Sequence, residues 1–413
     1  MKNKTIVLAI MLVGVLSIKS TDPRAVNRMI FEQSYSFINY DINKLEAKKP
    51  KGLDHFFSKL DKMMKTNEGK VRVVQIGDSH IQADYFSGRL RELLQLTFGN
   101  GGRGFVYPYR IARTNNPANY KVNYTGLWQS CRSVQNNASC DFGVSGITSA
   151  TNSADATFNL DFTTESFMNY DFSKVRLFYK QTPNAFRVDF DNPNDEDFYY
   201  DEIPGHGYSD FFFSKPLTDL RVSFKQDDSS QNFFQIYGME LENKQPGIIF
   251  NAIGTNGADV KSYHRCAMFT SQLEALRPDL VIISLGTNDG YVPTSWFNEV
   301  EFKNQYIELI KKVRAANPNT SILLTTPGDN YRKRRYHNYN MVTIQKALYE
   351  IGEEYNCVVW DLFDVMGGRY SIKKWYYNGL AQRDLVHYTK RGYETQAELL
   401  YDAIMSAYEK RLD

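Results

Sequence analysis

The sequence predicts an α/β protein whose parallel sheet is covered by helices on both faces and interrupted by an all-β insertion. Short, nearly continuous apolar runs alternate with helical stretches in the first part and in the C-terminal half of the chain. Between them lies a long region in which polar residues alternate with aromatic or β-branched ones. Because predicted α/β elements both precede and follow this region, we expect it to leave and rejoin a single domain.

The α/β part begins with the apolar run VRVVQI at 71–76, which predicts a buried strand. Apolar residues then recur at helical spacing over 86–98, and Gly99 ends that predicted helix. Further buried strands are predicted at 248–253, 280–285, 321–326 and 357–362, with helices at 301–316 and 341–355.

The alternating region covers residues 107–247, including KVRLFYK, AFRVDF, DLRVSFK and FFQIYGMELE. Asn, Asp, Gly and Pro separate these segments, as expected for short strands joined by turns. We therefore divide the chain into a leader at 1–20, a first α/β part at 21–106, the insertion at 107–247 and a second α/β part at 248–413.

The N-terminal segment has the pattern of an export signal. Lys2 and Lys4 precede the apolar stretch IVLAIMLVGVLSI, which is too short to span a bilayer, and the small residues Ser17 and Ser20 follow. We expect residues 1–20 to direct export to the periplasm or cell envelope. An uncleaved N-terminal anchor is the alternative, and we predict no other membrane span.

Composition excludes several classes of partner and cofactor. Lys and Arg number 49 against 47 Asp and Glu, so the net charge of +2 gives no sign of a nucleic-acid-binding protein. The four cysteines have no zinc-like spacing, and the glycine-rich GNGGRG at 99–104 follows a helix instead of a strand. We predict no metal and no cofactor. Cys131 and Cys140 form either a local disulfide or two separate thiols.

Ser79, in the stretch VVQIGDSH, lies where the first strand gives way to a helix. Ligands of open parallel sheets bind outside the carboxyl ends of the strands, and free backbone N–H groups at a helix start favour an oxyanion there. A helix-capping serine is the commoner use of this position. Taken alone, Ser79 favours the cap.

Three later segments favour a catalytic serine instead. NAIGTNGAD at 251–259 carries Gly254 and Gly257 after the second strand, and SLGTNDG at 284–290 carries Asn288 after the third. RDLVHYTKRGY at 383–393 places Asp384 and His387 three residues apart before the last helix. Together these residues supply a nucleophile, a base, an orienting carboxylate and oxyanion donors.

The ordered set GDSH, second-block glycine, GTND and D-x-x-H resembles the SGNH (GDSL-type) hydrolases. That resemblance implies a three-layer, flavodoxin-like hydrolase domain. It also implies that Ser79 is the nucleophile, His387 the base and Asp384 the residue that orients the imidazole. The oxyanion hole would consist of the Ser79 and Gly257 backbone N–H groups and the Asn288 side-chain amide, with Gly257 instead of Gly254 as the family's glycine.

Residues 77–109, together with an export signal and a β insertion, are similar to bacterial peptidoglycan O-acetylesterases and related carbohydrate esterases. The resemblance implies an exported serine esterase that removes acetyl groups from the C6 hydroxyl of N-acetylmuramic acid. Its partner would be a glycan or cell-wall polysaccharide, and the insertion would resemble a carbohydrate-binding β-sandwich. A glycan O-acetyltransferase with the same triad, an acetyl esterase for a plant or exopolysaccharide, and a noncatalytic glycan-binding protein are the alternatives.

Two basic features have open roles. Arg103, in the glycine-rich loop, is either a substrate-binding residue or a solvated loop residue. The run YRKRRYHNY at 331–339 follows the fourth strand of the α/β domain. It is either a solvated face or a contact for an anionic glycan.

Overall fold

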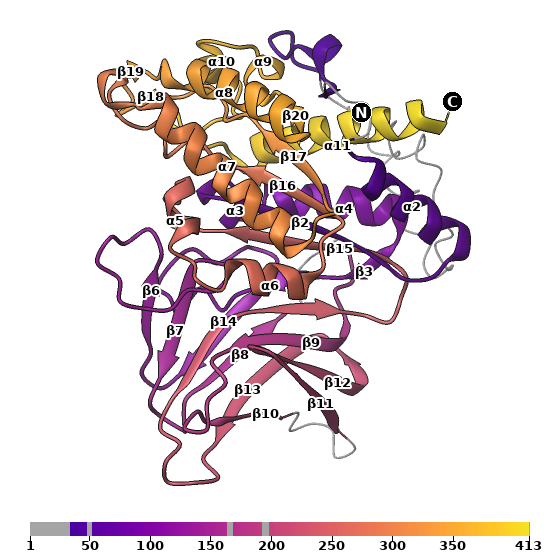
Figure 1. Ribbon diagram of the computed structural model, residues 1–413, viewed down its shortest axis with the longest axis vertical. Helices are drawn as coiled ribbons and strands as arrows, with labels where there is room; N and C mark the ends of the chain where they lie inside the picture. Colours follow the sequence, from indigo (N-terminus) through magenta and orange to yellow (C-terminus); the bar gives the residue numbers. More distant parts are fainter. Residues whose placement is uncertain (1–33, 48–51, 163–167, 192–197, 413) are drawn as a thin grey trace, which may run out of the picture.

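The computed structural model describes residues 34–47, 52–162, 168–191 and 198–412. The leader predicted at 1–20 lies outside these residues. The described chain forms an α/β domain, at the top in Figure 1, and a β module below it. Within the described residues, no helix combines the length and apolar character needed to cross a membrane.

The main sheet of the α/β domain has seven strands in the order β1-β20-β17-β16-β2-β15-β3. In that order they are β1 (Leu45–Glu46), β20 (Val358–Trp360), β17 (Ser321–Thr325), β16 (Leu280–Ser284), β2 (Lys70–Gly77), β15 (Gly247–Gly254) and β3 (Asn100–Gly102). Only the edge strand β1 pairs antiparallel, with β20, and the other neighbours are parallel. The five apolar runs are therefore the parallel strands that the sequence predicts.

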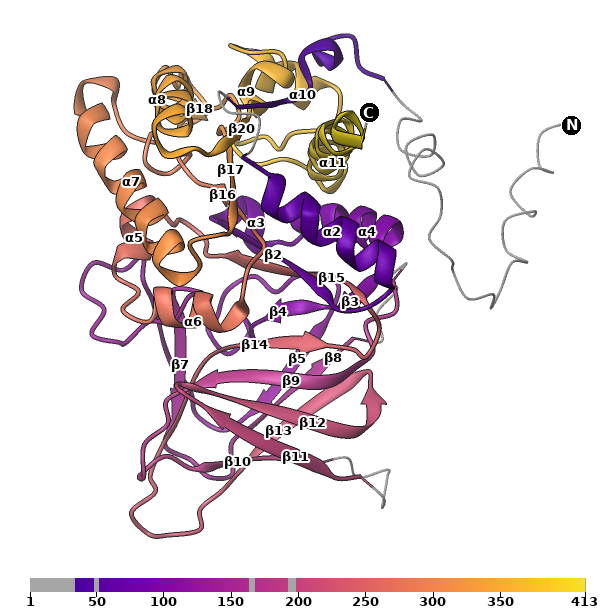
Figure 2. The same ribbon diagram turned by 45° about the vertical axis from the view of Figure 1, so that its right-hand side comes forward.

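Helices cover both faces of this sheet (Figures 1 and 2). One face packs against α2 (Asp54–Thr66), α4 (Phe86–Phe98), α9 (Leu362–Val365), α10 (Ser371–Tyr377) and α11 (Lys390–Leu412). The other face packs against α6 (Phe269–Leu276), α7 (Glu299–Ala316) and α8 (Asn340–Tyr355). The short helices α3 (Ser79–Gln82) and α5 (Val260–His264), the single turns η1 (Tyr40–Ile42) and η2 (Thr294–Trp296), and the hairpin β18 (Tyr331–Arg332) and β19 (Tyr336–His337) complete this domain.

The β module is built from two antiparallel sheets. The smaller contains β5 (Lys121–Thr125), β8 (Thr157–Asp161), β10 (Arg187–Asp191) and β13 (Asp219–Lys225). The larger contains β4 (Gly104–Val106), β6 (Gln129–Arg132), β7 (Ile147–Thr151), β9 (Phe172–Tyr179), β11 (Tyr200–Gly205), β12 (Tyr208–Leu217) and β14 (Phe234–Glu242). Aromatic rings join the two sheets, since Phe224 and Phe234 have centroids 4.3 Å apart, and Phe190 and Phe211 4.7 Å apart. The module is thus a sandwich with an aromatic core.

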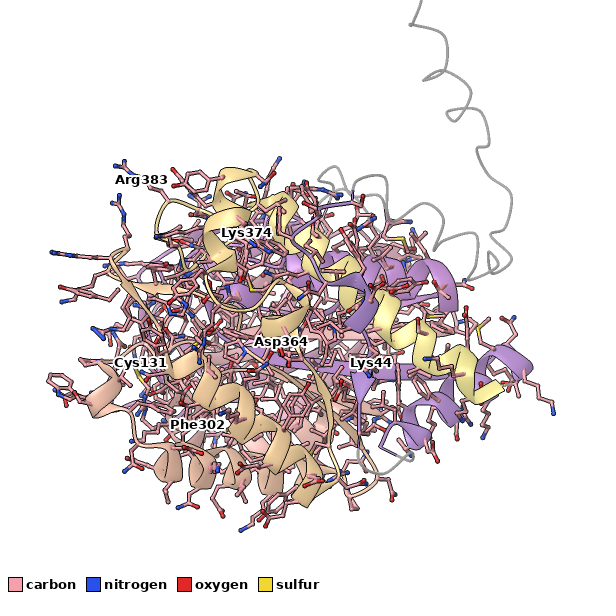
Figure 3. The ribbon with its side chains drawn as sticks, turned by 90° about the horizontal axis from the view of Figure 1, so that it is seen from above. Lys44, Cys131, Phe302, Asp364, Lys374 and Arg383 are labelled. Atoms are coloured by element: carbon pink, nitrogen blue, oxygen red, sulfur yellow. A yellow bond between two sulfur atoms is a disulfide. The ribbon has the colours of Figure 1, made fainter. Side chains whose placement is uncertain are left out.

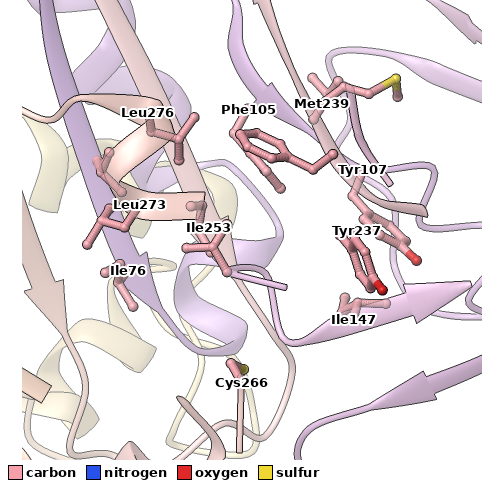
Figure 4. Packing of buried hydrophobic residues seen from close by; sticks show 14 of the residues in the cluster. Ile76, Phe105, Tyr107, Ile147, Tyr237, Met239, Ile253, Cys266, Leu273 and Leu276 are labelled. Atoms are coloured by element: carbon pink, nitrogen blue, oxygen red, sulfur yellow. The ribbon is translucent and has the colours of Figure 1, made fainter. Parts of the chain in front are cut away.

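The β module and the α/β domain share one hydrophobic core (Figure 4). Ile76 and Ile253, from the main sheet, belong to the same buried cluster as Leu273 of α6 and Phe105 and Met239 of the module. β4 pairs with β14 inside the larger module sheet, directly after β3 has left the main sheet. The module therefore packs along the sheet domain instead of extending from it on a linker.

Cys131 and Cys140 form a disulfide at the start of the β module, while Cys266 and Cys357 are free and buried. Of the two alternatives left by the sequence, the structure has the disulfide. It joins β6 to the loop that precedes β7.

Candidate active site

Three neighbouring strands end at the same edge of the main sheet and place the candidate residues there. Gly77, the last residue of β2, pairs with Gly254 at the end of β15 and with Ser284 at the end of β16. Ser79, Gly257 and Asn288 follow these three strand ends within a few residues. The parallel register therefore brings together segments that lie far apart in the sequence.

Two glycines position the turns at this edge for different reasons. A Cβ on Gly254 would lie 2.3 Å from the backbone nitrogen of Gln82 and 2.8 Å from the carbonyl oxygen of Asp78, so only glycine lets the Ser79 turn approach β15. Gly257 instead has a φ of +82° with open space around it. Gly257 lines the pocket that contains Ser79, as the family resemblance implies, whereas Gly254 has a packing role.

Ser79, His387 and Asp384 form one hydrogen-bonded chain. The Ser79 Oγ lies 2.9 Å from His387 Nε2, and His387 Nδ1 lies 2.7 Å from Asp384 Oδ2. The other Asp384 oxygen accepts the backbone N–H groups of Val386 and His387, each at 3.0 Å. The carboxylate thus fixes its own loop and the imidazole on that loop, with Nδ1–H directed at Asp384 and Nε2 facing the serine.

The charged forms of His387 and Asp384 stabilise one another. The hydrogen bond to Asp384 raises the pKa of His387, against the opposing effect of burial. Burial would raise the pKa of Asp384, but hydrogen bonds from the His387 side chain and from the loop backbone lower it to about 2. Asp384 is therefore ionised at neutral pH, and His387 is a stronger base than an isolated histidine.

The three oxyanion donors expected from the sequence lie around one pocket, and they differ in whether they already have a hydrogen-bond acceptor. Within the described residues, the backbone N–H groups of Ser79 and Gly257 have no hydrogen-bond acceptor. The Asn288 Nδ2 is already engaged, because it donates to Asp78 Oδ2 at 3.0 Å and to the Ala258 carbonyl at 2.9 Å. Two free donors and one oriented amide therefore border the serine.

Two further aspartates at this edge stabilise its turns. Asp78 accepts the backbone N–H of His80 at 2.9 Å in addition to the Asn288 amide. Asp289 accepts the backbone N–H of Val260 at 3.1 Å, and burial raises its pKa to about 7. Both carboxylates thus hold backbone segments that carry the candidate oxyanion donors.

The pocket has a volume of about 590 Å³ and includes residues that the sequence did not single out. These are Ala83, Tyr85, Asn115, Asn256, Thr287, Tyr291, Gln382, Val386 and Tyr393. Asn115 comes from the inserted segment, so the β module contributes to the wall of the pocket. No motif marks these positions, although their closeness in sequence to Ser79, Asn288 and His387 could have suggested several of them.

Gln82, which the sequence also did not single out, connects the pocket to the β module. Its buried amide donates to the Thr114 hydroxyl at 3.0 Å and to the Asn115 carbonyl at 2.9 Å, and its carbonyl oxygen accepts the Asn256 N–H at 2.7 Å. One side chain therefore holds the loop after β15 against the inserted segment.

His80 lies behind the candidate base. Its Nδ1 is 2.9 Å from the Tyr393 hydroxyl, and its ring centroid is 5.2 Å from that of His387. Burial lowers the pKa of His80, which favours the neutral imidazole beside His387. His80 is thus a packing and hydrogen-bonding neighbour of the Ser79–His387 pair.

The structure does not bring Arg103 to this pocket. Its side chain is 1% exposed and donates from Nη2 to Asp84 Oδ2 at 2.7 Å and to Asn119 at 3.0 Å. Arg91 binds the same Asp84 carboxylate at 2.8 Å. Burial would raise the pKa of Asp84, but the two cations lower it well below its usual range. Arg103 therefore belongs to a buried ion cluster, which differs from both the substrate-binding and the solvated positions considered from the sequence.

Comparisons with known proteins agree with this architecture. Residues 223–395 match the model of the GDSL-like Lipase/Acylhydrolase family. A solved structure of a peptidoglycan O-acetylesterase is similar over 91% of this chain and 99% of that chain, with 24% identity and a TM-score of 0.71. At this identity the likeness shows a shared fold, which includes the β module. No curated protein sequence matches the chain.

Two further solved structures are similar over a smaller part of the chain. A lipase/acylhydrolase from Enterococcus faecalis covers 39% of this chain and 77% of its own, with 19% identity and a TM-score of 0.31. A carbohydrate esterase family 3 protein from Talaromyces cellulolyticus covers 39% and 72%, with 17% identity and a TM-score of 0.31.

Proposed function

We propose that the chain, whose residues 223–395 match the model of the GDSL-like Lipase/Acylhydrolase family, is an exported serine esterase that removes O-acetyl groups from a glycan. The glycan that we propose as its substrate is peptidoglycan acetylated at the C6 hydroxyl of N-acetylmuramic acid. The observation that carries the proposal is the chain from Ser79 Oγ through His387 to Asp384, with distances of 2.9 and 2.7 Å, beside two free backbone donors. The shared fold with a peptidoglycan O-acetylesterase supports the choice of substrate.

In the proposed reaction, the Ser79 oxygen attacks the acetyl carbonyl while His387 Nε2 takes the serine proton. The Ser79 and Gly257 N–H groups stabilise the negative oxygen of the tetrahedral intermediate. The Asn288 amide becomes the third donor when it exchanges one of its two hydrogen bonds, to Asp78 or to the Ala258 carbonyl, for one to this oxygen. His387 then returns the proton to the departing sugar oxygen, which leaves an acetyl group on Ser79. Water attacks this ester, again with His387 as base, so that acetate and free serine are formed.

The direct test is acetate release from O-acetylated peptidoglycan by the purified protein, compared with release from acetylated xylan. We expect faster release from peptidoglycan. Ser79→Ala should lower the rate on either substrate by at least about 10³-fold, because it removes the nucleophile.

A matched control is Ser271→Ala, which removes an exposed hydroxyl on α6. It should retain the wild-type rate. A Ser79→Ala variant that keeps activity within a few-fold of wild type contradicts the triad, and faster release from xylan contradicts the peptidoglycan assignment.

A further inference from the structure

Two segments beside the pocket carry an excess of unpaired positive charge. They are 331–339, on the β18–β19 hairpin, and 369–383, around α10. Their cations are Arg332, Lys333, Arg334, Arg335, Arg369, Lys373, Lys374 and Arg383. Within the described residues none of these eight side chains forms an ion pair, and all except the half-buried Arg332 are exposed. The chain as a whole has a net charge of only +2, so this positive charge is concentrated locally.

Acidic residues near these cations do not neutralise them. Asp329 precedes the hairpin, but it is fully buried and is bonded to His337 Nε2 at 2.6 Å and to the backbone N–H of Ile372. Asp384 follows Arg383 and is bonded to His387. Both carboxylates therefore have partners inside the protein, and the cations face solvent.

Exposed tyrosines lie among the cations. Tyr336, Tyr339 and Tyr370 are 52%, 47% and 48% exposed. Arg335 lies over the Tyr336 ring at 5.6 Å and Arg369 over the Tyr339 ring at 5.8 Å. The hydroxyls of Tyr339 and Tyr370 are 3.1 Å apart. We call these three tyrosines and the eight cations the cationic tyrosine face.

The backbone of this face adopts conformations that its residues disfavour. Lys333 and Arg334 have φ values of +49° and +61° in the turn closed by the Arg335 N–H and the Arg332 carbonyl at 3.1 Å. Asn-Gly is the preferred pair in a hairpin turn that has two such residues. Tyr370 also has a positive φ, +67°, which is rare for a bulky side chain. Two cations and a tyrosine of this face thus occupy backbone conformations that favour other residue types.

The cationic tyrosine face is continuous with the candidate active site. The Lys333 N–H donates to the Tyr291 hydroxyl at 2.8 Å, and Tyr291 lines the pocket around Ser79. The Tyr331 N–H donates to the Leu385 carbonyl at 2.9 Å, within the loop that carries Asp384 and His387. Figure 1 shows the hairpin at the upper left, next to α8 and α10, and Figure 3 shows Arg383 at the outer edge of the molecule.

We propose that the cationic tyrosine face binds a carboxylate-bearing glycan chain that extends from the pocket. The exposed tyrosine rings offer apolar faces for sugar rings, and the unpaired cations bind carboxylates along the chain. This inference rests on the proposed function, since it places the acetylated sugar of the same chain at Ser79. It assigns recognition of the polymer's charge to the α/β domain, in addition to the contact that the β module makes at Asn115.

The test is binding, measured with the inactive Ser79→Ala protein so that it does not depend on catalysis. The ligand is soluble peptidoglycan strands without O-acetyl groups, and the comparison is the same strands with their carboxylates converted to methylamides. We expect the intact strands to bind about tenfold more tightly at low salt, and the difference to shrink as ionic strength rises.

The informative variant is Lys333→Asn together with Arg334→Gly. It removes two cations and introduces the pair that this turn prefers, so the protein should unfold at the same or a higher temperature. We expect about threefold to tenfold weaker binding to the intact strands and little change for the methylamidated ones.

A control with the same change in charge is Lys62→Gln with Lys65→Gln on α2, which lies far from the hairpin in Figure 1. It should bind the strands as the parent does. The inference is overturned if intact and methylamidated strands bind equally, or if the Lys333→Asn, Arg334→Gly variant binds the intact strands as tightly as its parent. Binding to phosphatidylglycerol vesicles without binding to the strands also overturns it, in favour of a membrane surface. If the strands bind as expected but the wild-type protein, which retains Ser79, releases no acetate from any glycan, only the proposed function fails.

Discussion

The Asn288 side-chain amide donates to the Asp78 carboxylate at 3.0 Å, although Asn288 is itself a candidate donor to the reacting oxygen. Its second hydrogen bond, to the Ala258 carbonyl, leaves the amide with a fixed orientation. Asp78 also accepts the His80 N–H, so it connects the Ser79 turn to the segment after β16. The amide is thus held in place before a substrate arrives, and it donates to the reacting oxygen by exchanging one of these two hydrogen bonds.

We expect Asn288→Ala to lower kcat for acetyl ester hydrolysis by about 10²- to 10³-fold, because one oxyanion donor is lost. Asp78→Ala should lower kcat by a smaller factor, since the amide would remain but lose its orientation. The double variant should be little worse than Asn288→Ala alone, because Asp78 would then have no amide to orient. Steady-state kinetics of the three variants measures this coupling, and purely multiplicative effects contradict it.

The His387–Asp384 hydrogen bond should also determine the pH dependence of the enzyme. His387 must be neutral to accept the serine proton, so kcat/KM should rise with pH through its pKa, which Asp384 raises. In Asp384→Asn that cause is removed, and the acidic limb should move to lower pH while kcat falls by about 10²-fold or more. The kcat/KM profile measures both changes. An unchanged limb, or one that moves to higher pH, contradicts the assigned hydrogen bond.

Arg103 should matter for stability and not for substrate binding. Arg103→Met leaves Asp84 buried with one cation instead of two, which we expect to lower the free energy of unfolding by roughly 2–4 kcal/mol. The KM of the folded variant for acetylated glycan should stay within about twofold of wild type. Denaturant unfolding and steady-state kinetics separate the two effects, and a large rise in KM without a loss of stability restores a role in substrate binding.

Gln82 should connect activity to the inserted segment. Gln82→Leu keeps a similar volume but removes the hydrogen bonds to the half-buried Asn256 N–H and the exposed Asn115 carbonyl, at a cost of about 0.5–1.5 kcal/mol per hydrogen bond. We expect both the unfolding temperature and kcat to fall, because the loop that carries Gly257 loses its support. Gln95→Leu, which removes a buried amide on α4 bonded to the carbonyls of Gly102 and Ile248, is a control with a similar chemical change. It should lower stability with a smaller effect on kcat.

An esterase and an acetyltransferase share the steps up to acetyl-Ser79 and differ in the acceptor. Given an activated acetyl donor and chito-oligosaccharide in water, the protein should release free acetate and form little acetylated sugar. Mass spectrometry of both products measures the ratio. If acetylated sugar is the main product and natural O-acetylated glycan releases little acetate, the protein is an acetyltransferase and the proposed hydrolysis is wrong.

The parallel strands and the grouping of the site could be predicted because both depend on local patterns. Apolar runs such as LVIISL specify buried strands, and the parallel arrangement places the residues that follow them at one edge. Ser79, Asn288 and His387 therefore come together as expected. The choice of Gly257 over Gly254 comes from the family resemblance, and the structure adds the physical reason, because the Gln82 backbone crowds Gly254 whereas Gly257 has a positive φ and open space.

The position of Arg103 could not be predicted, because no motif marks its partner Asp84. The ion cluster of Arg103, Arg91 and Asp84 also depends on how the β module packs against α4. The same holds for Asn115, which lies in a loop of the insertion and reaches the pocket only through long-range packing. The positive φ of Tyr370 is also set by its surroundings and not by residue type. Sequence patterns specify elements, whereas these features arise where separate elements meet.

The core shared by Ile253 and Phe105 restricts how the two parts of the molecule can move. A hinge between the β module and the sheet domain would expose continuous apolar surface to water, which opposes domain closure around a substrate. The distance from Asn115 to Ser79 is therefore set when the chain folds. Under the proposed function, a glycan would enter a cleft whose two walls are already in place, and selection among polymers would depend on rigid shape and charge and not on an opening and closing movement.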